Sequence, residues 1–207
     1  MDASALLVVP SYLVGTFPTG LLVGRRAGHD PTAEGSGNPG ATNVARVAGR
    51  NAGVVVLLVD LLKGALPAAV GLAVGGTLLG LACGAAAVLG HVAPVTRHFR
   101  GGKGVATASG MVIVVYPLLS LAVGAVFVTT ALVARRVSVA SIAMALALPV
   151  VLALGGRPPA EVAVAAGVSL CVIARHHENI TRLRHGQEPA FRLSRAPSHP
   201  SPPRDEP

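Results

Sequence analysis

Three short polar segments interrupt a sequence that is otherwise rich in Leu, Val and Ala. We refer to them as the first, second and third islands: residues 35–46 (GSGNPGATNVAR), 90–107 (GHVAPVTRHFRGGKGVAT) and 175–188 (RHHENITRLRHGQE). Their glycines allow the backbone to approach a ligand closely and to adopt positive φ angles, so that successive amide groups can surround an anion. The islands therefore have the composition of phosphate-binding loops.

The side chains of the first two islands add donors that suit oxyanions. Ser36, Thr42 and Asn43 offer neutral hydrogen-bond donors. Arg46 offers a planar guanidinium that can bind two oxygens at once, and Lys103 offers a compact charge. These residue types predict the binding of phosphate or of another anion.

Two further pairs of polar residues have helical spacing. His176 and Asn179 are three residues apart and would share one face of a helix. Asp60 and Lys63 are also three apart, within the apolar run 52–75, so they could pair with each other. Ionisable residues are costly in such a run and indicate either a function or a position inside a helix bundle. For Asp60 and Lys63, structural pairing and contact with a substrate are both consistent with the spacing.

Each island also has a simpler explanation. A loop of Gly, Ser and Asn between helices can be only a turn with a helix cap, and Arg97, Arg100 and Lys103 can be only positive charges that anchor a loop at the membrane surface. His91 can be a histidine at a helix end whose hydrogen bonds are satisfied. We favour anion binding because three islands of similar character are expected on one side of the membrane.

The composition indicates a membrane protein. Of the 207 residues, 52% are hydrophobic and 13% are charged, and the mean hydropathy is +0.63; soluble domains carry about 25% charged residues. The net charge of +8 does not indicate a nucleic-acid partner, because the basic residues lie in short clusters between apolar runs. The chain has only nine acidic residues, none of them in metal-binding pairs, and GGKG lacks the spacing of a nucleotide-binding P-loop. We therefore expect neither a metal nor a cofactor.

The apolar runs predict an all-α integral membrane protein with seven transmembrane helices, since a bilayer needs about 20 apolar residues per helix. The predicted spans are 4–24, 52–75, 78–96, 104–117, 118–134, 138–156 and 159–175. We divide 104–134 near Tyr116 and Pro117, because proline ends a helix. Nearly all Arg and Lys residues then fall on one side, which predicts the N-terminus outside, the C-terminus in the cytoplasm and all three islands at the cytoplasmic face of the cell membrane.

The chain is expected to contain one folded domain. Residues 1–188 would form the membrane domain, and residues 189–207, which are rich in Pro, Ser and Arg, would form a disordered cytoplasmic tail. The opening residues lack the basic segment of a signal peptide, so we expect them to belong to a retained first span. Cys83 and Cys171 lie in apolar runs and are expected to be buried thiols without a disulfide.

The strings GSGNPGATNVAR, DLLKG, GH..P....FRGGKGVAT and H..NI.RL..G.E, in this order, resemble the bacterial membrane acyl-phosphate:glycerol-3-phosphate acyltransferase family. The resemblance extends from about residue 10 to residue 188. It implies a seven-helix membrane enzyme that transfers an acyl chain from acyl phosphate to glycerol 3-phosphate, giving lysophosphatidic acid and inorganic phosphate in phospholipid biosynthesis. Acyl phosphate, glycerol 3-phosphate and membrane lipids would be its partners. Oligomeric state and acyl-chain preference are not implied.

Motifs and resemblance together predict the site residues. Those expected to take part in catalysis are Ser36, Arg46 and Lys103. Those expected to bind substrate or phosphate are Gly37, Asn38, Gly40, Thr42, Asn43, Gly101, Gly102, Thr107, Ser141, His176 and Asn179. Supporting positions are expected at Asp60, Lys63, His91, His177 and Glu188. Ser138 matches another serine of the family, whereas Ala93 and Thr96 stand where the family commonly has aromatic residues.

An acyl phosphate is already activated, so the enzyme would mainly position its substrates and neutralise charge. Ser36 would donate to an oxygen, or would carry the acyl group; we favour direct transfer because no histidine is adjacent in the sequence. His176, His91 or a substrate phosphate could act as the base. An anion transporter is the alternative function, and the lack of polar residues in spans one, four, five and seven argues against it.

Overall fold

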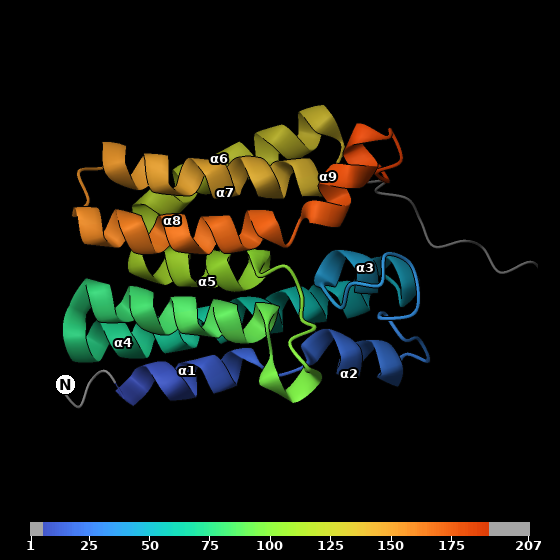
Figure 1. The fold of residues 1–207 in the computed structure, drawn as a ribbon, viewed down its shortest axis with the longest axis horizontal. Coiled ribbons are helices and arrows are strands. Elements are labelled where there is room, and N and C mark those ends of the chain that lie inside the picture. The colour runs from blue at the N-terminus through green and yellow to red at the C-terminus, as the bar shows by residue number, and fades with distance from the viewer. Residues whose placement is uncertain (1–5, 191–207) are drawn as a thin grey trace, which may run out of the picture.

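The protein is described here by a computed structural model that covers residues 6–190, and every regular element within that range is helical. The helices are α1 (Val8–Gly15), α2 (Thr19–Arg26), α3 (Ala41–Val47), α4 (Arg50–Val92), α5 (Val105–Val115), α6 (Pro117–Ala134), α7 (Val137–Leu154), α8 (Pro159–Ala174) and α9 (His177–Arg184), with a 3₁₀ turn at Val95–Arg97. The long helices pack side by side as a bundle (Figure 1). The predicted all-α architecture is confirmed.

Helix α4 is a hairpin of two helical arms. The chain reverses at Gly75 and Gly76, and Gly76 has a φ of 76° that side chains rarely tolerate. The arms then run back along each other, so that Gly71 lies against Leu79 and Gly80 lies against Ala68. The two arms correspond to the predicted spans 52–75 and 78–96, although the helix ends at Val92 rather than at residue 96.

The first predicted span, 4–24, is wrong as a single helix. Helix α1 ends at Gly15 and α2 begins at Thr19, because Pro18 has no amide hydrogen to continue the ladder. At the break the carbonyl of Phe17 accepts the amide of Thr19 at 2.9 Å, and Lys63 Nζ donates to the same oxygen at 2.8 Å. A buried lysine 46 residues away thus stabilises the interruption.

The predicted break near Tyr116 and Pro117 is confirmed: α5 ends at Val115, and Pro117 is the first residue of α6. By length and apolar composition alone, three helical segments within residues 6–190 are able to cross a membrane, and a fourth if α8 and α9, which are bent by 54°, form one span. Helix α5 is shorter than a full crossing. Seven crossings and their orientation therefore stay a prediction.

Small residues allow the helices around the site to pack backbone against backbone. A Cβ atom at Gly15, Gly90, Gly64 or Gly110 would lie within 2.1 Å of a carbonyl oxygen on a neighbouring helix. The contacts join α1 to the second arm of α4, and α5 to the first arm. Close approach through small residues is typical of membrane helices, where burial of apolar surface does not drive association. This packing fixes the start of α5, two residues after Lys103.

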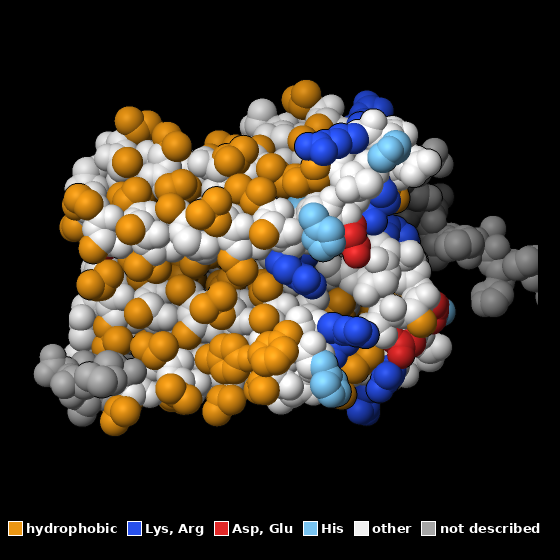
Figure 2. All heavy atoms as spheres, viewed as in Figure 1, with side chains coloured by type: hydrophobic (Ala, Val, Ile, Leu, Met, Phe, Trp, Pro, Cys, Tyr) orange, Lys and Arg blue, Asp and Glu red, His pale blue; other side chains and the backbone are white. Residues whose placement is uncertain are grey.

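Charged and apolar side chains are separated along the bundle. Lys, Arg, Asp, Glu and His gather at the end where the loops of the three islands lie, whereas the flanks are covered with apolar side chains (Figure 2). Leu118, Val133 and Leu154 are at least 80% exposed. Such a surface suits lipid as solvent. The predicted tail from residue 191 onward lies outside the described residues.

Candidate active site

The first island is organised by Asn43, which is 3% exposed. Its amide nitrogen donates to the carbonyls of Pro31 and Glu34, both at 3.0 Å. Its oxygen accepts the amide of Ser36 at 2.9 Å and the guanidinium of Arg46 at 3.4 Å. Asn43 was predicted to bind phosphate, but in this structure its amide holds the loop and positions two other site residues.

The remaining residues of this island lie around that loop. Asn38 accepts the amide of Gly40 at 2.8 Å, and Gly37 adopts a φ of 69° that favours glycine. Thr42 is exposed. The Ser36 hydroxyl makes no hydrogen bond with any residue between 6 and 190. Ser36 and Arg46 therefore have groups that remain free for a ligand.

The glycines of the second island are clamped between two elements. The amides of Gly101 and Gly102 donate to the carbonyls of Val92 at 3.1 Å and His91 at 3.0 Å. The Arg175 guanidinium donates to the carbonyls of the same glycines, at 3.0 and 3.3 Å. Both amides were expected to face a phosphate. In the structure both already donate to backbone carbonyls, so this expectation is wrong. A glycine is required at Gly102 for another reason: a Cβ there would lie 2.1 Å from the His91 ring.

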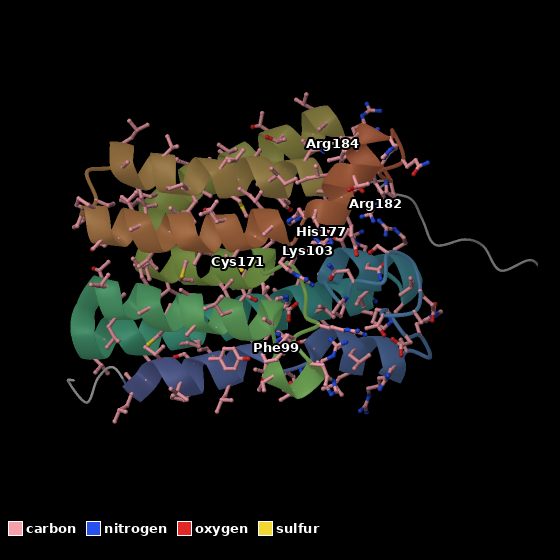
Figure 3. The ribbon with its side chains drawn as sticks, viewed as in Figure 1. Phe99, Lys103, Cys171, His177, Arg182 and Arg184 are labelled. Carbon is pink, nitrogen blue, oxygen red and sulfur yellow. The ribbon has the colours of Figure 1, made fainter. Side chains whose placement is uncertain are left out.

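Lys103 connects the second island to the third. Its ammonium donates to the side-chain oxygen of Asn179. The Asn179 nitrogen donates to Glu188 at 2.7 Å, and Glu188 also accepts from Arg182 at 2.8 Å. An ionised carboxylate only accepts, so Glu188 fixes the Asn179 amide with its oxygen toward Lys103. In Figure 3, Lys103, His177 and Arg182 lie toward the charged end of the bundle, and Cys171 lies further along α8 toward the opposite end.

The Lys103 environment weakens its hold on the proton. Burial of the side chain, together with the nearby charge of Arg182, lowers the pKa of Lys103 to about 8. The ammonium is thus still the main form at neutral pH. An anion beside it would favour the charged form, so this position is suited to bind phosphate.

His176 is buried in the turn that follows α8, with 2% of its surface exposed. Its Nδ1 lies 2.7 Å from the carbonyl of Val172, which requires a proton on Nδ1 and leaves the Nε2 lone pair free. Burial lowers the pKa of His176, so its neutral form is favoured. His177, by contrast, is exposed, and its Nδ1 lies 3.1 Å from the carbonyl of Ala174.

Asp60, Lys63 and His91 form a buried cluster beside this loop. Lys63 Nζ lies 2.8 Å from Asp60 Oδ1 and 3.2 Å from His91 Nδ1, in addition to its bond with the carbonyl of Phe17. The cluster lines a narrow cavity of about 20 Å³ that also reaches Gly101 and Gly102. Lys63 thus has three partners within the protein, which favours structural pairing over substrate contact.

The predicted hydroxyl residues of the helices are buried. Thr107 is 0% exposed at the start of α5 and packs against Gly64. Ser141 is 3% exposed and donates to the carbonyl of Val137 at 2.9 Å within α7. Among residues 6–190, neither hydroxyl contacts Lys103 or Asn179 through a hydrogen bond. Neither hydroxyl therefore belongs to the hydrogen-bond network of Lys103.

One cavity of about 340 Å³ brings the three islands together. It is lined by Gly37 and the adjacent Thr32, by Arg97, Arg100 and Gly101, and by Arg175. Arg175 was not among the predicted site residues, although it directly precedes His176 and its guanidinium holds the glycine loop. Within the described part of the chain, no group of three or more His, Cys, Asp and Glu residues is arranged to hold a metal.

Comparison with known proteins agrees with these motifs. The family model for glycerol-3-phosphate acyltransferase matches residues 5–186. Glycerol-3-phosphate acyltransferases of Syntrophotalea carbinolica and Geobacter metallireducens are 43% and 47% identical, and the alignments cover 93% and 90% of this chain and 100% and 97% of those proteins.

Two crystal structures share the fold. They show PlsY (YgiH), an integral membrane glycerol 3-phosphate acyltransferase, in its glycerol 3-phosphate form and its lysophosphatidic acid form. The TM-scores are 0.88 and 0.85 at 38% identity, with 92% and 91% of this chain and 96% and 95% of those chains covered. This chain belongs to the glycerol-3-phosphate acyltransferase family.

Proposed function

We propose that this protein transfers an acyl chain from acyl phosphate to the 1-hydroxyl of glycerol 3-phosphate, forming lysophosphatidic acid and inorganic phosphate. The observation that carries the proposal is the bond from the Lys103 ammonium to Asn179, which joins the second island to the third. Both substrates carry phosphate, and cationic and amide donors converge there. Glycerol 3-phosphate and lysophosphatidic acid are the ligands named for the related PlsY structures, which supports the same acceptor and product here.

The chemical step needs little covalent help from the protein. The substrate hydroxyl oxygen attacks the acyl carbon, the bond from that carbon to the phosphate oxygen breaks, and phosphate leaves with the electron pair. Arg46 and Lys103 would neutralise the phosphate oxygens, and Ser36 would donate to an oxygen of the acyl phosphate. Preorganised donors of this kind lower the barrier by stabilising charge that develops in the transition state. Asn179 would orient glycerol 3-phosphate.

Geometry favours His176 over His91 as the group that takes the hydroxyl proton. The Nδ1 atom of His91 lies 3.2 Å from Lys63 Nζ, and its ring packs against Gly102. The tautomer of His176 is fixed by Val172 and leaves Nε2 free to accept a proton. A substrate phosphate remains the alternative base, since phosphate esters titrate near pH 6.

Direct transfer is favoured over an acylated Ser36. A serine nucleophile needs a base within hydrogen-bonding distance. The Ser36 hydroxyl has no such partner among the described residues, and His176 bonds to a carbonyl of α8. An acylated serine would retain a radiolabelled acyl chain after denaturation in the absence of glycerol 3-phosphate, and we expect no label to be retained.

The donor is tested by offering three acyl donors to the purified protein. Acyl phosphate, acyl-CoA and acyl-carrier protein are each incubated with glycerol 3-phosphate, and lysophosphatidic acid is measured by mass spectrometry. We expect product with acyl phosphate alone. Phosphate release is not sufficient as a readout, because a mixed anhydride also hydrolyses in water; reactions without glycerol 3-phosphate measure that background.

Product formed only from acyl-CoA or acyl-carrier protein would contradict the donor, while leaving the family assignment intact. Lack of product from every donor, together with phosphate uptake into sealed vesicles, would favour the alternative of an anion transporter. Excess EDTA should not reduce turnover, because the proposed roles use no metal.

A further inference from the structure

Three arginine side chains share the cavity at the charged end of the molecule. Arg97, Arg100 and Arg175 line it together with Thr32 and Gly37, and no carboxylate of residues 6–190 does. Its volume of about 340 Å³ lies within the range of small-molecule sites, roughly 300–1,000 Å³. The cavity thus has the size for a small ligand and a strong positive charge.

The nearby acidic groups do not balance this charge. Asp30 pairs with Arg25 at 3.0 Å, and Glu34 contacts His29 at 2.9 Å. Arg97 and Arg100 form no ion pair within the described part of the chain. A concave surface lined by charges of one sign concentrates its potential and attracts a counter-ion. An anion is therefore the ligand that the cavity favours.

The backbone holds two of these arginines in a strained turn. The carbonyl of Pro94 accepts the amides of Arg97 at 3.0 Å and Phe99 at 2.9 Å. His98 and Phe99 both adopt the left-handed region, with φ of 50° and 61°. Residues with side chains rarely adopt this conformation, and strain of this kind is typical of binding sites. The turn places Arg97 and Arg100 on the same cavity.

The residues that line the cavity do not include those of the Lys103 network. Lys103 does not line it and is bonded to Asn179, whereas Arg175 is fixed by the carbonyls of Gly101 and Gly102. We propose that Arg97, Arg100 and Arg175 form a second anion site, which binds a phosphate monoester in addition to the phosphate bound at Lys103. Guanidinium groups suit this ligand because each can donate two parallel hydrogen bonds to phosphate oxygens.

The phosphate monoester could come from water or from the membrane. Phe99 and Val95, on the same turn, are 62% and 54% exposed, and Figure 3 places Phe99 on the α1 side of the bundle, at the border of the charged end. An acyl chain could lie along these side chains while its headgroup occupies the cavity. Glycerol 3-phosphate or inorganic phosphate would use the same guanidinium groups without that apolar contact.

The test compares the loss of two charges at the cavity with the loss of two elsewhere. Arg97→Gln/Arg100→Gln is matched by Arg26→Gln/Arg50→Gln, whose arginines are exposed and form no ion pair among residues 6–190. Each pair is made in the wild type and in Lys103→Met, and folding is checked by melting in detergent. Equilibrium dialysis with radiolabelled phosphate and glycerol 3-phosphate measures the soluble ligands. Native mass spectrometry measures lysophosphatidic acid in nanodiscs.

In Lys103→Met we expect the second site to bind at least one of these ligands. That binding should be at least about tenfold weaker after Arg97→Gln/Arg100→Gln, because charge-assisted hydrogen bonds to the phosphate are lost. Arg26→Gln/Arg50→Gln should leave that binding unchanged. Loss confined to lysophosphatidic acid identifies a lipid headgroup, and loss of all three identifies a site for phosphate esters in general.

Equal binding in the two pairs, or an equal decrease in both, would overturn the proposal. The role of Lys103 rests on the proposed function and is judged separately. If Lys103→Met alone loses no affinity, that role fails, while the comparison of the two arginine pairs still decides the second site.

Discussion

Lys103 is positively charged, largely buried and held by Asn179, whose amide is in turn fixed by Glu188. The α5 helix starts two residues later, so the ammonium is positioned by a rigid element. Arg182 keeps its bond to Glu188 if Lys103 is replaced. Removal of the lysine should therefore change charge at the site without leaving Glu188 unpaired.

We predict that Lys103→Met melts like the wild type in detergent but forms lysophosphatidic acid at least about a hundredfold more slowly, since removing one preorganised donor costs roughly this factor. Arg26→Met, which removes an exposed charge at the end of α2, should lose little. Equal turnover of the two variants would mean that Lys103 serves only as a positive charge at the membrane surface.

The pH dependence follows from the pKa of Lys103, which burial lowers to about 8. As the pH rises through this value, the free enzyme loses the charge that binds phosphate. We expect kcat/KM, which reports the free enzyme, to decline above about pH 8. Lys103→Arg should abolish the decline, because a guanidinium stays protonated throughout this pH range, although absolute activity would be lower. A decline that persists in Lys103→Arg would assign it to another group.

The residue types predicted the location of the polar groups well, but they predicted the role of each residue less well. Asn43 and Gly102 carry the signature of a phosphate loop, but one holds the loop through four hydrogen bonds and the other makes room for His91. Sequence spacing does not show which amides already have acceptors. Arg175 was missed for the same reason, since its partners are carbonyls 73 and 74 residues away.

Among the elements, the contact of α4 with α5 decides where Lys103 lies. A Cβ on Gly64 would lie 1.8 Å from the carbonyl oxygen of Thr107, and one on Gly110 would lie 2.0 Å from that of Leu61. In both cases the neighbour is backbone, so relief requires movement of a helix. Residues 61–64 of α4 thus set the distance to α5 and, through it, the position of the glycine loop.

Gly64→Ala should therefore lower both the melting temperature in detergent and the activity, since overpacking costs about 1–3 kcal/mol. The matched control is Gly124→Ala in α6, where no atom lies within 4 Å of the added Cβ. That variant should be as stable as the wild type, or more stable by up to about 1 kcal/mol through helix propensity. Similar melting of the two variants would show that α5 can shift without cost.

Helices were predictable from long apolar runs, and Pro117 marked a break that the structure contains. The break at Pro18 was missed because the run 4–24 is apolar on both sides of it. An apolar run indicates how long a span can be, but it does not show whether the helix is interrupted. At the interruption, Lys63 donates from another helix to the carbonyl of Phe17, which also accepts the amide of Thr19. Tertiary contacts of this kind are not visible in hydropathy.

In the whole molecule, the two ends of the bundle differ in charge. The end with the three islands carries Lys103 and most of the arginines (Figure 2). At the opposite end, Arg157 is paired with Glu161 at 3.1 Å. Because positively charged loops are retained in the cytoplasm, the end with the islands should face the cytoplasm.

The predicted orientation can be tested by the reactivity of single cysteines placed at the two ends of the bundle. Ala33 is exposed in the loop between α2 and α3, and Ala160 is exposed at the start of α8, at the opposite end of the bundle (Figure 1). With Cys83 and Cys171 replaced by alanine, Ala160→Cys should react with an impermeant maleimide on intact cells. Ala33→Cys should react only after the cells are permeabilised, which also shows that its thiol is accessible. The reverse pattern would place the islands outside, away from a cytoplasmic supply of glycerol 3-phosphate, and would contradict the proposed cytoplasmic site even if the purified enzyme is active.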